Sequence, residues 1–329
     1  MTNTLLSSGD LIADRRVAYA RMLAETGDFT AAAELVEQAL EIVPDWAPGW
    51  DLLGRYLERA GEIQKAILAW RRLDALDADG VFGAPLKLAA HGAGLAMAET
   101  ATAYVEALFD QYAPGFEAAL LQKLDYKVPE MLARLVLEEA RRRSAGQFAE
   151  ALDLGCGTGL MGEWLRRHVS HLSGVDLSAG MVAEAGRKGI YDRLTAGEMG
   201  AFLAGIAPAS ADLVTAADVF VYSGALEPVF AGVARVLAPG GLFAFSIEAH
   251  DGPEALVLRP SLRYAHNGET ARAALAAAGF EVIGFERQVL RRDGGVSIEG
   301  FVVLARRVQA VAGLPVAERE GEAVELVVN

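Results

Sequence analysis

The spacing of apolar positions divides the chain into a helical N-terminal part and a mixed part. Residues 13–80 repeat: Gly27 and Gly61 lie 34 positions apart, and so do Ala32 and Ala66. Such a period is typical of paired helices in which small residues allow close packing and a glycine turns the corner. We expect helices over 13–26, 29–42, 47–60 and 63–76.

From Tyr104 to Arg307, short apolar runs alternate with helical stretches. This alternation predicts an α/β fold, a mostly parallel Rossmann-like sheet with helices on both faces. The two apolar runs over 280–287 and 296–306 should pair as an antiparallel hairpin at its edge. The other expected strands are 149–154, 171–176, 191–196, 211–217 and 242–248, and the expected helices are 129–145, 160–168 and 269–278.

A length of 329 residues predicts about two domains. The pattern places a helical-repeat domain at 1–88, a connector helix at 89–105 and the α/β domain at 106–309. Residues 310–329 form an acidic tail, for which a flexible segment and a strand paired with a sheet edge are both open.

Charge and composition limit the classes of partner and the cellular location that we expect for this protein. The net charge of −14 argues against nucleic acid, because phosphate binding needs a basic surface. The basic runs Arg141–Arg143 and Arg291–Arg292 are expected to be solvated. No stretch approaches the ~20 apolar residues of a membrane span, and the first residues are too polar for a secretory signal. A single cysteine, Cys156, excludes an intrachain disulfide and favours the cytoplasm.

A glycine turn follows the first expected strand. Gly155, Gly157 and Gly159 allow a ligand to lie against bare backbone, and Asp176, which ends the next strand, can bind the two hydroxyls of a ribose. Leu160 stands where a dinucleotide fingerprint has its third glycine. Asp153 would repel a pyrophosphate and attract a cation. These residues predict a pocket for a cationic nucleoside.

This stretch resembles the first motif of class I S-adenosylmethionine-dependent methyltransferases, an acidic residue followed by Gly-x-Gly-x-Gly. The resemblance extends to Gly197-Glu198-Met199, where the family usually has an Asp that contacts adenine, and to the strand that ends at Asp218. It implies S-adenosylmethionine as the cofactor. The implied cofactor-binding residues are Asp153, Gly155, Cys156, Gly157, Asp176, Leu177, Met181, Glu198, Met199, Asp218 and Tyr112.

Three aromatic residues, Phe109, Tyr112 and Phe116, share one face of a helix. They indicate either a core stripe or a lid over the cofactor, because Phe-Asp-x-Tyr-Ala resembles the lid of many small-molecule methyltransferases. As a lid residue, Tyr112 would exclude water and position the acceptor.

The candidate general bases are His250 and His266, each in a loop near the ligand edge. Three further residues could orient an acceptor. They are Glu248, Asp218 and Tyr222. No cluster has the spacing of metal ligands, so no metal is expected.

The N-terminal period looks like two tetratricopeptide repeats, and nearly the whole chain resembles a bacterial group of methyltransferases that contain such repeats. The resemblance implies methyl transfer to a small-molecule acceptor. The repeats would dock on the catalytic domain, support a homodimer or bind a protein partner. Two alternatives stay open: a protein methyltransferase that recruits its substrate through the repeats, and a catalytically silent cofactor binder.

Overall fold

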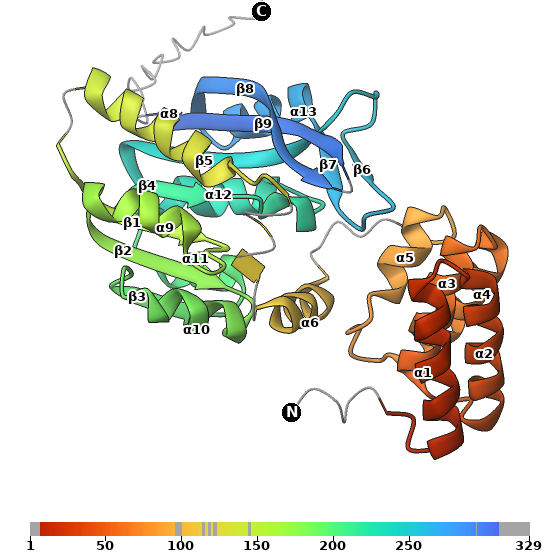
Figure 1. Cartoon of the computed structure of the whole chain (residues 1–329). Helices are drawn as coiled ribbons and strands as arrows, with labels where there is room; N and C mark the ends of the chain where they lie inside the picture. Colours follow the sequence, from red (N-terminus) through yellow and green to blue (C-terminus); the bar gives the residue numbers. More distant parts are fainter. Residues whose placement is uncertain are drawn as a thin grey trace, which may run out of the picture.

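The computed structural model describes residues 7–95, 101–113, 116, 117, 120, 124–143, 146–293 and 295–308. Its two parts lie side by side: an array of N-terminal helices and an α/β part built on one sheet (Figure 1). We call residues 11–90 the helical array and the described residues from 102 to 308 the sheet domain. The acidic tail at 310–329 lies outside the described residues.

The helical array consists of consecutive helices that pack each against the next. Gly27 and Gly61 both have positive φ, 88° and 81°, and each ends the first helix of a pair. Asp10 and Asp28 accept backbone N–H groups at the starts of two of the helices. The helices are α1 (Leu11–Glu25), α2 (Phe29–Ile42), α3 (Ala47–Arg59), α4 (Ile63–Leu76) and α5 (Ala84–Ala90).

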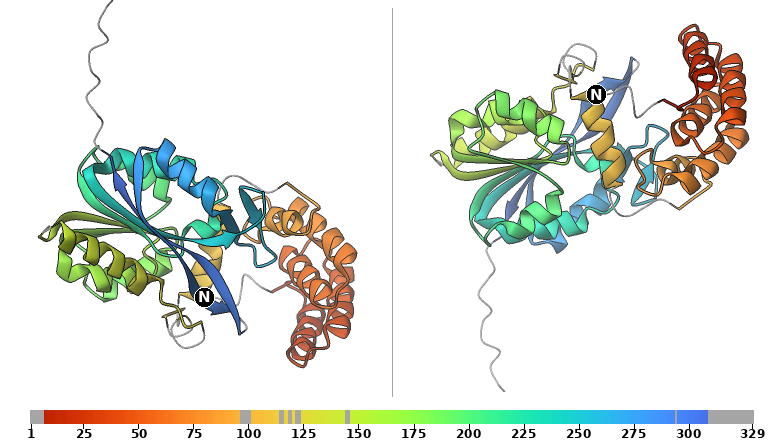
Figure 2. Two further views of the ribbon diagram at one scale, coloured as in Figure 1. Left: turned by 90° about the horizontal axis from the view of Figure 1, so that it is seen from above. Right: turned by 90° about the horizontal axis from the view of Figure 1, so that it is seen from below.

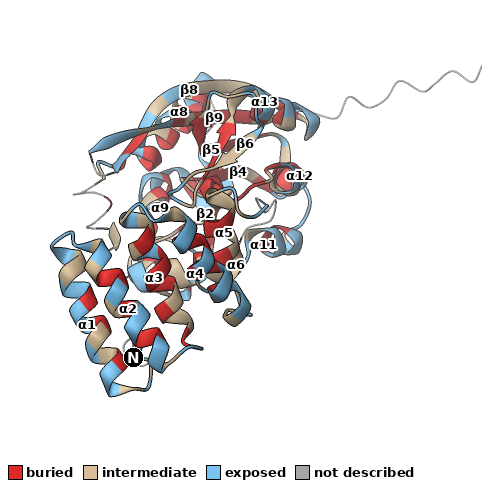
Figure 3. Cartoon of the chain, turned by 90° about the vertical axis from the view of Figure 1, so that its right-hand side faces the viewer, coloured by how far each residue is buried: buried red, intermediate tan, exposed pale blue. Residues whose placement is uncertain are grey.

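Small residues hold the array together. Ala32 and Ala66, one period apart, are both fully buried. Gly54 lets α3 approach α4 so closely that a Cβ there would overlap the ring of Trp70. Buried and exposed positions alternate along these helices, so each has one inner face (Figure 3). The expected helical pairs are confirmed as helices.

The sheet runs in the order β3-β2-β1-β4-β5-β7-β6, and β9 lies beside β5 with β8 at its outer edge. Strands β1 to β5 pair in parallel with one another in this order, and β5 also pairs in parallel with β7. Strand β6 is antiparallel to β7, and β9 is antiparallel to β5 and β8. The strands are β1 (Phe148–Leu154), β2 (Val169–Asp176), β3 (Arg193–Ala196), β4 (Ala211–Ala216), β5 (Leu237–His250), β6 (Leu256–Leu258), β7 (Tyr264–Asn267), β8 (Phe280–Asp293) and β9 (Val296–Arg307).

Helices cover both faces of this sheet (Figure 2). Because side chains alternate along a strand, Leu152 and Leu154 enter one core while Ala151 enters the other. The helical segments are α6 (Thr102–Tyr112), α8 (Val128–Arg142), α9 (Leu160–Leu165), η1 (Arg166–His168), α10 (Ala179–Arg187), α11 (Met199–Gly205), η2 (Phe220–Tyr222), α12 (Glu227–Val236) and α13 (Gly268–Ala277).

Four features differ from the expectations. The helix at Ala84–Ala90 was not expected, and a turn follows it because Gly92 has positive φ, whereas residues 96–100 of the expected connector helix lie outside the described residues. Strand β5 begins at Leu237, directly after α12, rather than at residue 242, and its pairing with β4 contains a shift in register. The short pair β6 and β7 was not expected, and the β8–β9 hairpin is longer than predicted. Within the described residues, no helix has the length and apolar character to cross a membrane.

Candidate functional site

A cavity of about 490 Å³ borders the carboxyl ends of β1, β2, β3 and β4. Ligands in open parallel sheets bind at this edge. Helix α6 and the turn between β6 and β7 contribute the opposite wall. The residues named from the sequence that line it are Gly155, Cys156, Gly157, Asp176, Leu177, Met181, Glu198, Met199, Asp218, Tyr112, Phe109, Phe116 and Tyr222.

The floor of the cavity is the glycine turn between β1 and α9. Gly155 has φ +61°, and a Cβ there would come within 2.5 Å of Val219 Cγ2. Gly157 has φ +52°, and a Cβ there would meet nothing within 4 Å, so its backbone is bare toward open space. Both positions require glycine, one for close packing and one for conformation.

Asp176 stands at the end of β2 in a fixed orientation. Its Oδ2 accepts a hydrogen bond of 2.9 Å from the backbone N–H of Gly157, and its Oδ1 accepts one of 2.9 Å from Ser178. Burial raises the pKa of this carboxyl, and these two bonds oppose the rise. Glu198 caps α11 by accepting the N–H of Ala201 at 2.7 Å.

Asp153 differs from our expectation. It is 1% exposed and is not among the residues that line the cavity. Its Oδ2 accepts from the Tyr191 hydroxyl at 2.7 Å and its Oδ1 from Thr215 at 2.8 Å. These two hydroxyl groups hold the carboxylate among buried side chains, outside the lining of the cavity. Burial raises its pKa to about 6.

Cys156 lies within the turn and is 5% exposed. Burial, with Asp153 and Asp176 nearby, raises the pKa of its thiol far above the ordinary value. The thiol therefore stays protonated and acts as a small packing residue rather than a nucleophile.

Helix α6 lies over the cavity and is tied to the helix after β2. Asp110 Oδ1 accepts from the Ser178 hydroxyl at 2.5 Å and from the Gly180 N–H at 3.2 Å. Phe109 contacts Tyr222 edge to face, with ring centroids 5.3 Å apart. Tyr112 lines the cavity but is 55% exposed. All three aromatic residues of this face line the cavity, and Phe116 also packs against a core, so the lid stays a prediction.

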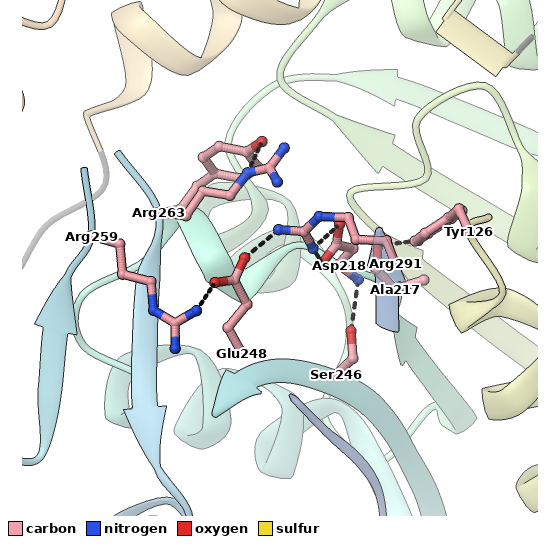
Figure 4. Close-up of polar contacts among 9 residues, drawn as sticks. Tyr126, Ala217, Asp218, Ser246, Glu248, Arg259, Arg263 and Arg291 are labelled. Atoms are coloured by element: carbon pink, nitrogen blue, oxygen red, sulfur yellow. Dashed lines mark hydrogen bonds and ion pairs between the residues drawn. The ribbon is translucent and has the colours of Figure 1, made fainter. Parts of the chain in front are cut away.

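A buried ion cluster lies where β4 and β5 end (Figure 4). Arg291, 1% exposed, donates through Nη1 to both carboxylate oxygens of Asp218 at 2.8 and 3.0 Å, and through Nη2 to Glu248. Glu248 also pairs with Arg259 at 3.2 Å. Our expectation of a solvated Arg291 was wrong, because β8 extends to Asp293 and turns this side chain inward.

Sequence reasoning missed Arg291, Arg263, Asp110 and Tyr104 as residues of this region. The signal for Asp110 was present, since it belongs to the Phe-Asp-x-Tyr-Ala stretch. Arg263 and Arg291 sit on a turn and a strand whose positions depend on long-range pairing, which local sequence does not indicate. Of the three candidates for orienting an acceptor, Asp218 and Tyr222 line the cavity, whereas Glu248 supports it from below through Arg291.

The two histidines proposed as bases do not line the cavity. His250 Nε2 lies 3.0 Å from Glu254, and His266 Nε2 lies 3.3 Å from the carbonyl oxygen of Gly224. The reason is that β5 continues to His250 and pairs with β7, placing His266 next to Ala249 in a ladder. Burial lowers the pKa of His266. We therefore correct the assignment of both histidines.

Acidic, histidine and cysteine side chains do not converge into a metal-binding group anywhere in the described part of the chain. Of the carboxylates that line the cavity, Asp218 is paired with Arg291, and Asp176 and Glu198 accept from backbone N–H groups.

Comparison with known families gives the same segment an identity. Residues 152–245 match a family model described as a methyltransferase domain. Residues 152–245 therefore form a methyltransferase domain. The match runs from within β1 to within β5 and so includes the ends of β1, β2, β3 and β4 that border the cavity. S-adenosylmethionine is the cofactor of this methyltransferase fold.

Two curated methyltransferases are similar over part of their length. Malonyl-[acyl-carrier protein] O-methyltransferase from Enterobacter lignolyticus is 34% identical over 110 residues, covering 33% of this chain and 43% of that protein. Dimethylglycine N-methyltransferase from Parasynechococcus marenigrum is 31% identical over 147 residues, covering 42% and 51%. The chain thus spans about half the length of these relatives, or less.

A solved structure is also similar. The magnesium protoporphyrin IX methyltransferase of Synechocystis PCC 6803, crystallised with bound S-adenosylhomocysteine, is 16% identical. The similarity covers 61% of this chain and 98% of that chain, with a TM-score of 0.46.

Proposed function

We propose that this protein transfers a methyl group from S-adenosylmethionine to a small-molecule acceptor in the cavity beneath α6. The observation that carries the proposal is a single cavity with room for both the cofactor and the acceptor. Its floor is the bare glycine turn with Asp176 and Glu198, and its other walls are aromatic side chains and arginines. One half suits a nucleoside and the other half is left for an acceptor.

The residues present fit the cofactor. A Cβ on Gly157 would occupy open space beside the turn, so a ligand can lie against this backbone. Asp176, oriented by two backbone N–H groups, would accept from the ribose hydroxyls, and Glu198 would accept from the adenine amino group. Asp153 would act from beneath the turn through its negative charge. When bound, the cofactor supplies an electrophilic methyl group on a sulfonium.

The cavity residues favour alignment and desolvation over base catalysis. Burial raises the pKa of Tyr104 to about 12 and that of Tyr222 in the same direction, so both phenols stay protonated at neutral pH. Neither phenol can therefore act as a general base at neutral pH. We infer that the acceptor atom has a free lone pair at this pH and does not first have to lose a proton of high pKa. By their names, one curated relative acts on malonyl-[acyl-carrier protein] and the other on dimethylglycine.

Titration calorimetry with S-adenosylmethionine and S-adenosylhomocysteine tests the cofactor half. We expect both to bind the full chain and Asp176→Asn to weaken binding at least about tenfold, because a charged hydrogen-bond acceptor is lost. The matched control is Glu150→Gln, at the other end of β1 and away from the cavity. Absence of binding to either compound would overturn the proposal.

The acceptor half is tested with cell extract and isotopically labelled cofactor. We expect low-molecular-mass products that gain the labelled methyl group, and their mass identifies the acceptor. If label enters only polypeptides, the protein methyltransferase is the better assignment. If the cofactor binds and no component of any extract gains label, the silent binder is favoured.

We further propose that α1 to α4 are two tetratricopeptide-type repeats that mediate partner or dimer contacts. Equivalent positions 32 and 66 are equally buried, and both repeats turn at a glycine with positive φ. The exposed apolar side chains of α1 support a contact role, because such groups are commonly covered by a partner. They are Leu11, Ile12, Tyr19 and Met22. The cytoplasm remains our proposed location, because the one cysteine is a buried thiol.

A further inference from the structure

Three guanidinium groups lie close together beside the acceptor half of the cavity, near the carboxylates of Asp218 and Glu248 (Figure 4). Arg291 and Arg259 together neutralise Asp218 and Glu248, since each carboxylate is paired with a guanidinium. A third guanidinium, that of Arg263, faces the same cavity (Figure 4). Two of these three arginines are therefore ion-paired with the two carboxylates, and Arg263 is not.

Arg263 has no acidic partner among the residues that the structure describes. Its nitrogens lie more than 4.0 Å from every described carboxylate oxygen, including that of Asp293 in the cavity lining. Its Nε donates a weak hydrogen bond of 3.3 Å to the Tyr222 hydroxyl, and its guanidinium carbon lies 5.7 Å from that ring's centroid. No described group accepts from its two Nη atoms, so the end of the planar fork remains available.

A tight turn holds Arg263 in place. This turn joins β6 to β7, and it is closed by hydrogen bonds from Arg259 N to Arg263 O at 2.9 Å and from Leu262 N to Arg259 O at 2.8 Å. Leu262 has φ +58°, a conformation that an L-residue adopts at a cost. Arg259 anchors the turn by donating to Glu248 at 3.2 Å and to the Ala249 carbonyl at 2.6 Å. The hydrogen bonds of this turn thus fix the position of the Arg263 backbone, and with it the place where the guanidinium can bind a ligand.

We propose that Arg263 binds a carboxylate of the methyl acceptor, with the rings of Tyr104, Phe109 and Tyr222 against its apolar body. This inference rests on the proposed function and assigns the acceptor to the monocarboxylates. A guanidinium fork matches the two oxygens of a carboxylate. A monoanion fits this place better than a phosphate dianion, because a dianion would add more negative charge to a cavity that Asp218 and Asp293 already line.

Benzoate and benzamide test this assignment, because they share a ring and differ in charge. Each is titrated into the full chain saturated with S-adenosylhomocysteine, and its affinity is measured by ligand-observed NMR. We expect benzoate to bind at least about tenfold more tightly than benzamide, as a charge-assisted hydrogen bond provides. Arg263→Met should remove the preference, and Arg263→Lys should retain part of it, because the charge stays and the fork is lost.

The control is Arg272→Met. Arg272 also lies over an aromatic ring, 3.8 Å from the centroid of Phe285, but outside the cavity. This variant should keep the wild-type preference, and every variant should keep wild-type affinity for S-adenosylhomocysteine.

Two results would overturn the proposal: equal affinities of wild type for benzoate and benzamide, or an unchanged preference in Arg263→Met. If inorganic phosphate displaces benzoate at a concentration below that of benzoate, the ligand of Arg263 would be a phosphate rather than a carboxylate, and the proposal would also be overturned. Failure of the wild-type chain to bind S-adenosylhomocysteine is a separate result, and it would overturn the proposed function itself.

Discussion

Asp153 carries a buried charge that its surroundings only partly stabilise. Its carboxylate accepts from Tyr191 and Thr215, but no cation pairs with it among the described residues. Burial is the largest influence on it and raises the pKa to about 6, whereas the two hydroxyl groups oppose this rise. The charged form is therefore less favourable in the folded chain than in water.

This raised pKa predicts a pH dependence of stability. Below pH 4 both states hold the proton, whereas between pH 4 and 6 the unfolded state loses it first. The free energy of unfolding should therefore fall as pH rises through this window, by up to ~3 kcal/mol from this group. Asp153→Asn should remove that part of the slope, as measured by urea unfolding at several pH values. Parallel curves for wild type and variant would contradict this prediction.

The sequence-predicted residues that the structure brings to one cavity share one property: their position follows from the local backbone. Gly155, Gly157 and Asp176 end two strands whose apolar runs are visible in the sequence, and the structure brings them to one cavity. Arg291 is different. Its partner Asp218 lies 73 positions away, so its burial depends on how far β8 extends and on which strand lies beside it. The local sequence pattern predicts neither the extent of β8 nor the strand that lies beside it.

At the scale of elements, the glycine turn sets the shape of the site. Gly155 combines positive φ with a close approach to Val219, so a side chain there faces both strain and overlap. The turn also carries the N–H that orients Asp176. A change at this position should therefore affect stability and cofactor binding together.

We expect Gly155→Ala to lower the free energy of unfolding by about 1–3 kcal/mol and to weaken S-adenosylhomocysteine binding at least about tenfold. Chemical denaturation and calorimetry measure the two effects. Gly205→Ala is the control, because a Cβ at Gly205 meets nothing within 4 Å and no positive φ is involved. Equal behaviour of the two variants would show that the turn tolerates a side chain.

The elements that sequence reasoning missed are short or continuous with a predicted neighbour. Strands β6 and β7 are three and four residues long, too short for a periodic pattern to identify. Yet they determine the positions of both candidate histidines. Strand β7 pairs with the end of β5, so His250 and His266 lie in the β5–β7 ladder rather than in loops. They also create the turn that presents Arg263.

At the scale of the whole molecule, three hydrophobic cores divide between two parts. Two cores belong to the sheet domain, one on each face of the sheet, and the third lies entirely within the helical array. The parts meet where Gly83, before α5, faces the ring of Tyr104 on α6. Tyr104 also lines the cavity, so the array touches the lid without supplying residues to the cofactor half.

This division predicts two thermal transitions with different responses to ligand. Since the cofactor half lies within the sheet domain, S-adenosylhomocysteine at 100 times its Kd should stabilise that domain by about 2.7 kcal/mol and leave the array unchanged. Differential scanning calorimetry would show one transition rising by several degrees while the other stays fixed.

Gly54→Ala identifies the transitions, because a Cβ at Gly54 overlaps the ring of Trp70 in the core of the array. This variant should lower the transition that does not respond to ligand and leave the other in place. A single transition that shifts as a whole, both with ligand and with Gly54→Ala, would instead mean that the contact between Gly83 and Tyr104 couples the array to the sheet domain. The helical array would then be an integral part of the folded enzyme rather than an attached module.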